Sequence, residues 1–162
     1  MIPLFHDQIA NGGPVTITDP DMTRFLLSLD DAVDVIFAAL RDARAGETYV
    51  PRVPAVRIAE LAEALIGERQ IETTLTGIRP GEKLHEILVS DEESHRTVER
   101  AGYYVIQPIL PELRISELDG QPLAGEYISS HAVMAPQEIH ALLKKRGLLV
   151  ESPSEVEGKI PR

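Results

Sequence analysis

Gly77-Ile78-Arg79-Pro80-Gly81-Glu82-Lys83-Leu84-His85-Glu86 follows a β-type segment at residues 71–76 and leads into a helical pattern. Glycine and proline bend the chain here, so the segment predicts a strand, a turn and a helix in succession. The Arg79 guanidinium can fork onto phosphate oxygens, and Glu82 can accept hydrogen bonds from a vicinal diol such as a ribose. The turn therefore suits a phosphorylated sugar nucleotide. An Arg-x-x-Glu spacing also fits a solvated ion pair worth about 0.3–0.5 kcal/mol.

Helix and strand patterns alternate along the rest of the chain, which predicts a mixed α/β fold. Ser28 followed by Asp31 resembles a capping box, and Gly67 follows the last residue of another helical pattern. The predicted helices cover residues 3–10, 28–45, 57–66, 92–100 and 136–145, and the predicted strands cover residues 14–18, 47–50, 71–76 and 103–106.

Composition bounds the class of protein. A length of 162 residues suits one compact domain, and 43% hydrophobic with 26% charged residues is typical of a globular protein. No run approaches the roughly 20 apolar residues of a membrane span. The absence of cysteine excludes disulfides, thiol nucleophiles and zinc–thiolate sites, and it fits a reducing compartment. We therefore expect a cytoplasmic protein without a membrane span.

The formal net charge of −10 repels nucleic acid, so neither DNA nor RNA is an expected partner. An anionic ligand would need local arginines, because charges act within about 8 Å at physiological salt. Arg24, just before the Ser28 helix, is such a candidate beside Arg79. Alternatively, Arg24 packs its stem on Phe25 and pairs with a neighbouring aspartate, Asp19 or Asp21.

The motifs of common cofactor and metal sites are missing from the sequence. The five histidines lack metal-ligand spacing, and neither a Gly-x-Gly-x-x-Gly fingerprint nor a phosphate loop is present. Tyr103 and Tyr104 are followed four residues later by Gln107 and Pro108, so no Tyr-x-x-x-Lys pair occurs there. We expect no metal site, no catalytic residue and no cofactor-binding residue in this chain.

Several blocks of the sequence, in order, resemble the C-terminal half of the polysaccharide-biosynthesis branch of the extended short-chain dehydrogenase/reductase family. The blocks are residues 19–25, 29–33, 46–51, 77–86, 93–95, 105–108 and 126–131. Within the branch the chain resembles most the inverting UDP-N-acetylglucosamine 4,6-dehydratases, which begin the pathway to pseudaminic acid. The resemblance implies a UDP-sugar-binding domain over residues 1–149, followed by a flexible tail over residues 150–162.

The resemblance also implies roles for individual residues. Arg24 and Arg79 resemble diphosphate ligands, and Glu82 resembles the acid that holds the uridine ribose hydroxyls. The strand containing Val15, Thr16 and Ile17 resembles the segment along which uracil lies, largely through backbone groups. The complete enzymes bind NADP or NAD in a Rossmann domain, and the resemblance implies that they are homo-oligomers.

The family's cofactor loop and catalytic residues precede the point where this chain begins, so the resemblance implies a substrate-binding part without its Rossmann half. Such a chain is a truncated reading frame, an excised domain or a subunit that joins a separate Rossmann protein. We expect it to bind no cofactor and to be inactive alone. In this family the helix over residues 28–45 and the strand after it pack on the Rossmann sheet, so we expect uncovered apolar surface and an uncovered strand edge.

Three alternatives stay open at the level of sequence. UDP-sugar C4 epimerases and dehydratase/5-epimerases share the blocks that contain Arg24 and Glu82. A non-catalytic nucleotide-sugar-binding or docking module is an alternative of another class. A non-functional remnant is the third.

Overall fold

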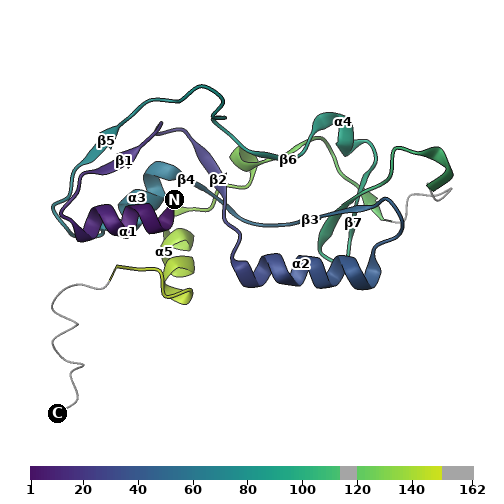
Figure 1. The fold of residues 1–162 in the computed structure, drawn as a ribbon, viewed down its shortest axis with the longest axis horizontal. Coiled ribbons are helices and arrows are strands. Elements are labelled where there is room, and N and C mark those ends of the chain that lie inside the picture. The colour runs from purple at the N-terminus through teal and green to yellow at the C-terminus, as the bar shows by residue number, and fades with distance from the viewer. Residues whose placement is uncertain (114–119, 151–162) are drawn as a thin grey trace, which may run out of the picture. The chain divides into compact units, whose positions relative to one another are not determined.

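The computed structural model describes residues 1–113 and 120–150, which form two compact units (Figure 1). The first unit contains residues 1–22, 57–84 and the described residues from 134 onward, and the second contains residues 23–56 and the described residues of 85–133. Each unit is therefore assembled from segments that are distant in sequence. Residues 151–162, nearly all of the predicted tail, lie outside the described residues.

Helices packed on a pair of parallel strands form the first unit. Strands β1 (Val15–Ile17) and β5 (Thr73–Leu75) pair in register, with Val15 opposite Thr73. Helices α1 (Ile2–Ala10) and α3 (Ile58–Ile66) pack on β1, and α5 (Pro136–Lys145) packs on α3. The core contains the buried residues Phe5, Ile9, Val15, Ile17, Ile58, Leu61, Leu65, Ile139 and Leu143. This arrangement confirms the predicted α/β class.

The predicted helices of this unit are confirmed to within one residue at each end because local signals mark their ends. Helix α3 ends at Gly67, which has a φ of 60°. Helix α5 begins with Pro136 in its first turn, where proline is tolerated because no intrahelical N–H bond is lost.

The second unit contains a four-stranded antiparallel sheet in the order β3–β8–β7–β9. These strands are Thr48–Pro51 (β3), Tyr103–Ile106 (β8), Thr97–Arg100 (β7) and Gln121–Pro122 (β9). Strand β6 (Ile87–Val89) pairs with β10 (Tyr127–Ile128), and β2 (Thr23–Phe25) pairs with β4 (Ala55–Arg57). The remaining elements are α2 (Leu29–Asp42), α4 (Asp91–Ser94), η1 (Pro111–Leu113) and η2 (Ser129–His131). Val50, Val89 and Ile106 form a buried core cluster of this unit.

Helix α2 begins at the predicted capping box. The Ser28 hydroxyl accepts a hydrogen bond from the Asp31 N–H at 3.1 Å, and the Asp31 carboxylate accepts one from the Ser28 N–H at 3.3 Å. The helix ends at Asp42, three residues before its predicted end.

The apolar side chains of α2 are largely exposed, as the sequence predicted. In this fully described helix only Ala38 is buried, whereas Leu29 and Leu40 are 80% and 78% exposed. The apolar face of α2 comprises Leu29, Val33, Ile36, Phe37 and Leu40. An amphipathic helix normally buries such a stripe, so this face is a surface without a cover in the described structure.

Two predicted helices are wrong. The segment after Gly77 leads into strand β6 instead of a helix. The helix predicted over residues 92–100 ends after one turn at Ser94, and residues 97–100 form β7. A capping box of Ser90 and Glu93 starts this turn, but pairing with β8 overrides helix propagation after it. The hairpin turn between β7 and β8 uses Ala101 and Gly102, both at positive φ.

Candidate functional site

Arg79 and Glu82 lie on an exposed turn of the first unit, where the sequence placed them. The Glu82 carboxylate accepts a hydrogen bond from the Arg79 N–H at 2.9 Å, and the Glu82 N–H donates to the Arg79 carbonyl at 3.0 Å. Gly77 precedes the pair and Gly81 lies between its two members, at φ values of 78° and 88°, which only glycine adopts without strain. The two side chains form no ion pair with each other within the described residues. Glu82 therefore stabilises the turn through the backbone, while the Arg79 guanidinium projects from an exposed loop.

The strand expected to face a nucleobase is held along both sides. The Val15 N–H donates to the Glu72 carbonyl at 2.9 Å, and the side chains of Val15 and Ile17 are buried. The Gln8 side chain accepts from the Thr16 N–H at 3.1 Å and donates to the Thr16 hydroxyl at 2.7 Å. This amide presents a donor beside an acceptor, as the imide edge of uracil does. A base that bonds to the Thr16 N–H would have to take the place of Gln8.

Arg24 lies on β2 of the second unit and is held by two described contacts. Its Nη1 donates to the Thr23 carbonyl at 2.7 Å, and its Nε lies 3.4 Å from the Glu86 carboxylate. The side chain is 22% exposed, so it is constrained without being closed off from solvent. The described ion pair of Arg24 is thus with the last residue of the Gly77–Glu86 segment, 62 residues away in sequence, a contact that the sequence did not predict.

The buried hydroxyl groups of Thr23 and Ser129 form hydrogen bonds next to this ion pair. The Thr23 hydroxyl is 2.6 Å from the Ser129 hydroxyl and 2.9 Å from His85 Nδ1. The Ser129 hydroxyl also accepts a hydrogen bond from the Glu86 N–H at 2.9 Å. Sequence reasoning missed Thr23, His85, Glu86 and Ser129 as site residues. Thr23 lies within the block of residues 19–25, His85 and Glu86 lie within the quoted turn segment, and Ser129 lies within the block of residues 126–131, so their sequence signal was membership of these blocks.

The six site residues predicted from sequence divide between the two units. Val15, Thr16, Ile17, Arg79 and Glu82 belong to the first unit, and Arg24 belongs to the second. That these groups converge on one ligand stays a prediction.

A buried ion pair dominates the electrostatics of the sheet in the second unit. The Glu47 side chain is 1% exposed, and its carboxylate accepts hydrogen bonds from both terminal nitrogens of Arg100. The Arg44 N–H donates to the same carboxylate at 2.9 Å, and Gln107 donates to it at 3.2 Å. Burial acts to raise the pKa of Glu47, but these hydrogen bonds outweigh it and the pKa is lowered.

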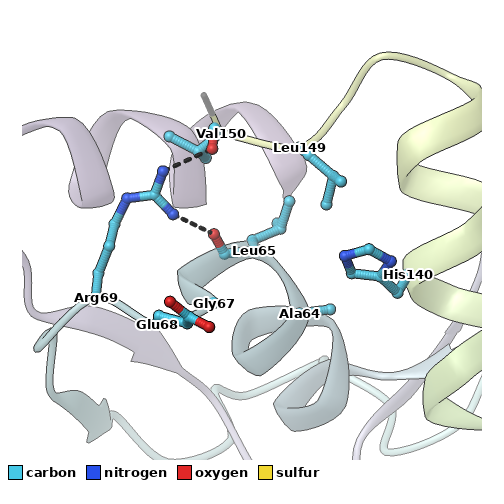
Figure 2. Close-up of a pocket in the computed structure, with 8 residues that line it drawn as sticks. All are labelled: Ala64, Leu65, Gly67, Glu68, Arg69, His140, Leu149 and Val150. Atoms are coloured by element: carbon cyan, nitrogen blue, oxygen red, sulfur yellow. Dashed lines mark hydrogen bonds between the residues drawn. The ribbon is translucent and has the colours of Figure 1, made fainter. Parts of the chain in front are cut away.

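Two pockets are lined by residues other than the predicted site residues. The first has a volume of about 330 Å³ and is shown in Figure 2. Its lining residues are Ala64, Leu65, Gly67, Glu68, Arg69, His140, Leu149 and Val150. Figure 2 shows the Arg69 guanidinium donating to the carbonyls of Leu65 and Val150, so this arginine caps the end of α3. The second pocket, of about 410 Å³, lies in the second unit beside Tyr104 and Tyr127, Arg52, Glu126 and His131.

Comparison with known proteins places these features in a family context. Residues 1–108 match the family described as polysaccharide biosynthesis protein. The chain is 40% identical over 109 residues to UDP-N-acetylglucosamine 4,6-dehydratase (inverting) of Campylobacter jejuni subsp. jejuni serotype O:23/36, covering 67% of this chain and 32% of that protein. It is 44% identical over 108 residues to UDP-glucose 4-epimerase of Rickettsia felis, covering 65% of this chain and 32% of that protein.

Two further relatives extend the comparison. An uncharacterized membrane protein of Methanocaldococcus jannaschii is 40% identical over 117 residues, which are 67% of this chain and 35% of that protein. No helix within the described residues is long and apolar enough to cross a membrane. The crystal structure of Pen from Bacillus thuringiensis superposes with a TM-score of 0.81 at 29% identity, covering 92% of this chain and 46% of that chain. The chain thus spans about a third of the length of these curated relatives.

Proposed function

Because the chain belongs to the polysaccharide biosynthesis protein family, we propose that it is the substrate-binding part of a nucleotide-sugar enzyme and that it binds the UDP moiety of a UDP-N-acetylhexosamine. Relatives named for a UDP-N-acetylglucosamine dehydratase and a UDP-glucose epimerase support this substrate class. In the proposal, Arg24 and Arg79 bind the diphosphate, Glu82 accepts from the ribose hydroxyls, and the strand of Val15, Thr16 and Ile17 lies along the uracil.

The observation that carries the proposal is the placement of Arg24. A guanidinium that is partly buried and held by Glu86 keeps one geometry, so an anion that binds it loses little side-chain entropy. The net charge of −10 makes such local cationic groups necessary for any phosphate ligand. Arg79 contributes a second guanidinium on an exposed turn, where it is accessible to a ligand.

For the complete enzyme we propose a 4,6-dehydratase reaction on UDP-N-acetylglucosamine. A bound NADP or NAD would accept hydride from the sugar and return it, and the catalytic residues would come from a Rossmann domain, in the same or another chain. A C4 epimerase or a dehydratase/5-epimerase is the alternative, and the Rickettsia felis epimerase supports it equally by similarity. Both reactions require the enzyme to bind the UDP moiety, so the proposed role of this chain is the same in each.

Isothermal titration calorimetry with UDP tests the proposed binding function. The wild-type chain should bind UDP and UDP-N-acetylglucosamine, and Arg79→Ala should weaken UDP binding by about tenfold, the lower range for a lost hydrogen bond to a charged group. Uridine, which lacks phosphate, should bind both proteins equally weakly. Arg41→Ala, which removes an exposed arginine of α2 that pairs with Asp42, should leave UDP binding unchanged. A folded wild-type sample without measurable UDP binding would contradict the proposal.

The exposed apolar face of α2 favours a second function, docking on a nucleotide-binding domain. Leu29, Val33, Ile36, Phe37 and Leu40 recur at helical spacing on one side of the helix and are exposed to solvent. A contiguous apolar stripe of this kind marks an interaction surface. We propose that a Rossmann domain, in the same or another chain, covers it.

The double variant Phe37→Glu/Leu40→Glu tests the docking function. Both side chains are exposed, so each substitution should change the free energy of unfolding by no more than about 0.5 kcal/mol. When co-expressed with the part of the Campylobacter jejuni dehydratase outside the 109 matched residues, the wild-type chain should co-purify and the double variant should not. Ala38→Glu is the matched control on the buried side of the helix and should unfold the second unit instead. Equal co-purification of the wild type and the double variant would refute docking through α2.

A further inference from the structure

We propose that Ser129 and Thr23 are positioning residues of the anion site. Their buried hydroxyls hold Glu86 and Arg24 in place, so that the Arg24 guanidinium keeps the geometry in which it binds a diphosphate. This inference rests on the proposed function, because it assigns a supporting role at the same site. Ser129 is 0% exposed and Thr23 is 2% exposed, so neither hydroxyl is available to contact a ligand directly. Their effect on binding must pass through Arg24 and Glu86.

The Ser129 hydroxyl joins the two segments that carry the ion pair. It accepts a hydrogen bond from the Glu86 N–H at 2.9 Å, which places the backbone of Glu86. It also lies 3.3 Å from the Thr23 carbonyl, to which it can donate, and this same carbonyl accepts from Arg24 Nη1 at 2.7 Å. The Ser129 N–H donates to the Glu86 carbonyl at 2.8 Å, so Glu86 is held through both of its backbone polar groups. One side chain of η2 thus links β2 to Glu86 within the second unit.

The hydroxyl protons can be arranged in two ways, and both keep a hydrogen bond between Ser129 and Thr23 as well as the one from the Glu86 N–H. In the first arrangement, Ser129 donates to the Thr23 hydroxyl, which donates to His85 Nδ1. In the second, His85 Nδ1 donates to the Thr23 hydroxyl, which donates to Ser129, and Ser129 donates to the Thr23 carbonyl. In both arrangements, loss of the Ser129 hydroxyl removes an acceptor of the Glu86 N–H, and loss of the Thr23 hydroxyl removes a partner of His85 Nδ1 and of the Ser129 hydroxyl. The Arg24–Glu86 pair then loses hydrogen bonds that position its two residues.

Two other buried hydroxyls of the second unit provide matched controls. The Ser94 hydroxyl donates to the Asp91 carbonyl at 2.6 Å, and the Thr97 hydroxyl donates to the Glu93 carbonyl at 2.7 Å. Both residues are 1% exposed, as buried as Thr23 and Ser129, but they bond to carbonyls of α4. Their removal should cost similar stability without disturbing Arg24.

Titration of UDP into the full chain tests the inference. Ser129→Ala and Thr23→Val should each weaken UDP binding by roughly tenfold, whereas Ser94→Ala and Thr97→Val should stay within about twofold of the wild type. Thr23→Ser keeps the hydroxyl and should restore affinity. The NMR signal of the Arg24 Nε–H should shift in Ser129→Ala and stay in place in Ser94→Ala.

The outcomes separate this inference from the proposed function. If Arg24→Ala weakens UDP binding while Ser129→Ala and Thr23→Val bind like their controls, the positioning role is refuted and the binding function stands. If the folded wild-type chain binds no UDP, both are refuted. If Ser129→Ala does not fold, the comparison of Thr23→Val with Thr23→Ser decides, and equal affinities of these two variants would refute the inference.

Discussion

Glu47→Gln should lower the free energy of unfolding by about 3 kcal/mol, the cost of removing one partner from a buried ion pair. The substitution keeps the shape of the side chain but removes its charge, so the mostly buried Arg100 guanidinium loses its counter-ion. All described partners of the Glu47 carboxylate are N–H donors, from Arg100, Arg44 and Gln107. A glutamine NH2 group would face some of these donors instead of accepting from them. Urea unfolding followed by circular dichroism measures the loss.

Glu99→Gln is the matched control for this prediction. Glu99 makes the same kind of ion pair, with Arg52, but its side chain is 42% exposed. Water solvates both partners when the pair is broken, so the loss should stay below about 1 kcal/mol. Equal losses for Glu47→Gln and Glu99→Gln would show that burial does not set the strength of the Glu47 pair.

The difference in the free energy of unfolding between wild type and Glu47→Gln should depend on pH. The folded-state pKa of Glu47 is lowered, so its contribution to stability is present above the ordinary glutamate pKa and is lost as pH falls through the folded-state value. The wild-type free energy of unfolding should therefore approach that of the variant in acid, because glutamine does not titrate. A difference that stays constant from neutral pH to pH values well below the ordinary glutamate pKa would contradict this assignment.

Arg24→Ala should weaken UDP binding by roughly 10- to 100-fold, more than Arg79→Ala. Arg24 is partly buried and oriented by Glu86 and the Thr23 carbonyl, so its charge is less screened by water and its geometry is set before the ligand arrives. The partner that remains in the variant, Glu86, is 42% exposed and can be solvated. Calorimetry at one fixed salt concentration measures the change.

Two variants separate the role of the guanidinium from that of positive charge in general. Arg24→Lys keeps the charge but loses the planar fork, so its affinity should fall between those of the wild type and Arg24→Ala. Arg52→Ala removes a different arginine of the second unit, one that pairs with Glu99, and should leave UDP binding within about twofold. If Arg52→Ala and Arg24→Ala weaken binding equally, the effect is one of net charge and Arg24 is not a specific ligand.

The sequence predicted the candidate site through short blocks, and the structure added the contacts between them. Arg24, Arg79 and Glu82 were identified because guanidinium and carboxylate groups on turns suggest a chemistry by themselves. Thr23 and Ser129 were not, because a hydroxyl has no evident role until its partner is known. Their contact joins residues 106 positions apart, and local sequence patterns carry no information about a pairing at that distance.

The amino-acid sequence by itself determined the ends of α1, α3 and α5 and the start of α2, because caps, glycine and proline act through hydrogen bonds within a few residues. It also determined the family, because the motif blocks and their order can be recognised in the sequence without knowledge of the fold. Only the tertiary structure decided that residues 97–100 form a strand and that the Gly77–Glu86 segment enters β6, because these outcomes depend on strand partners elsewhere in the chain. Pairing energy from distant strands outweighed the local preference for helix after the Ser90 capping box.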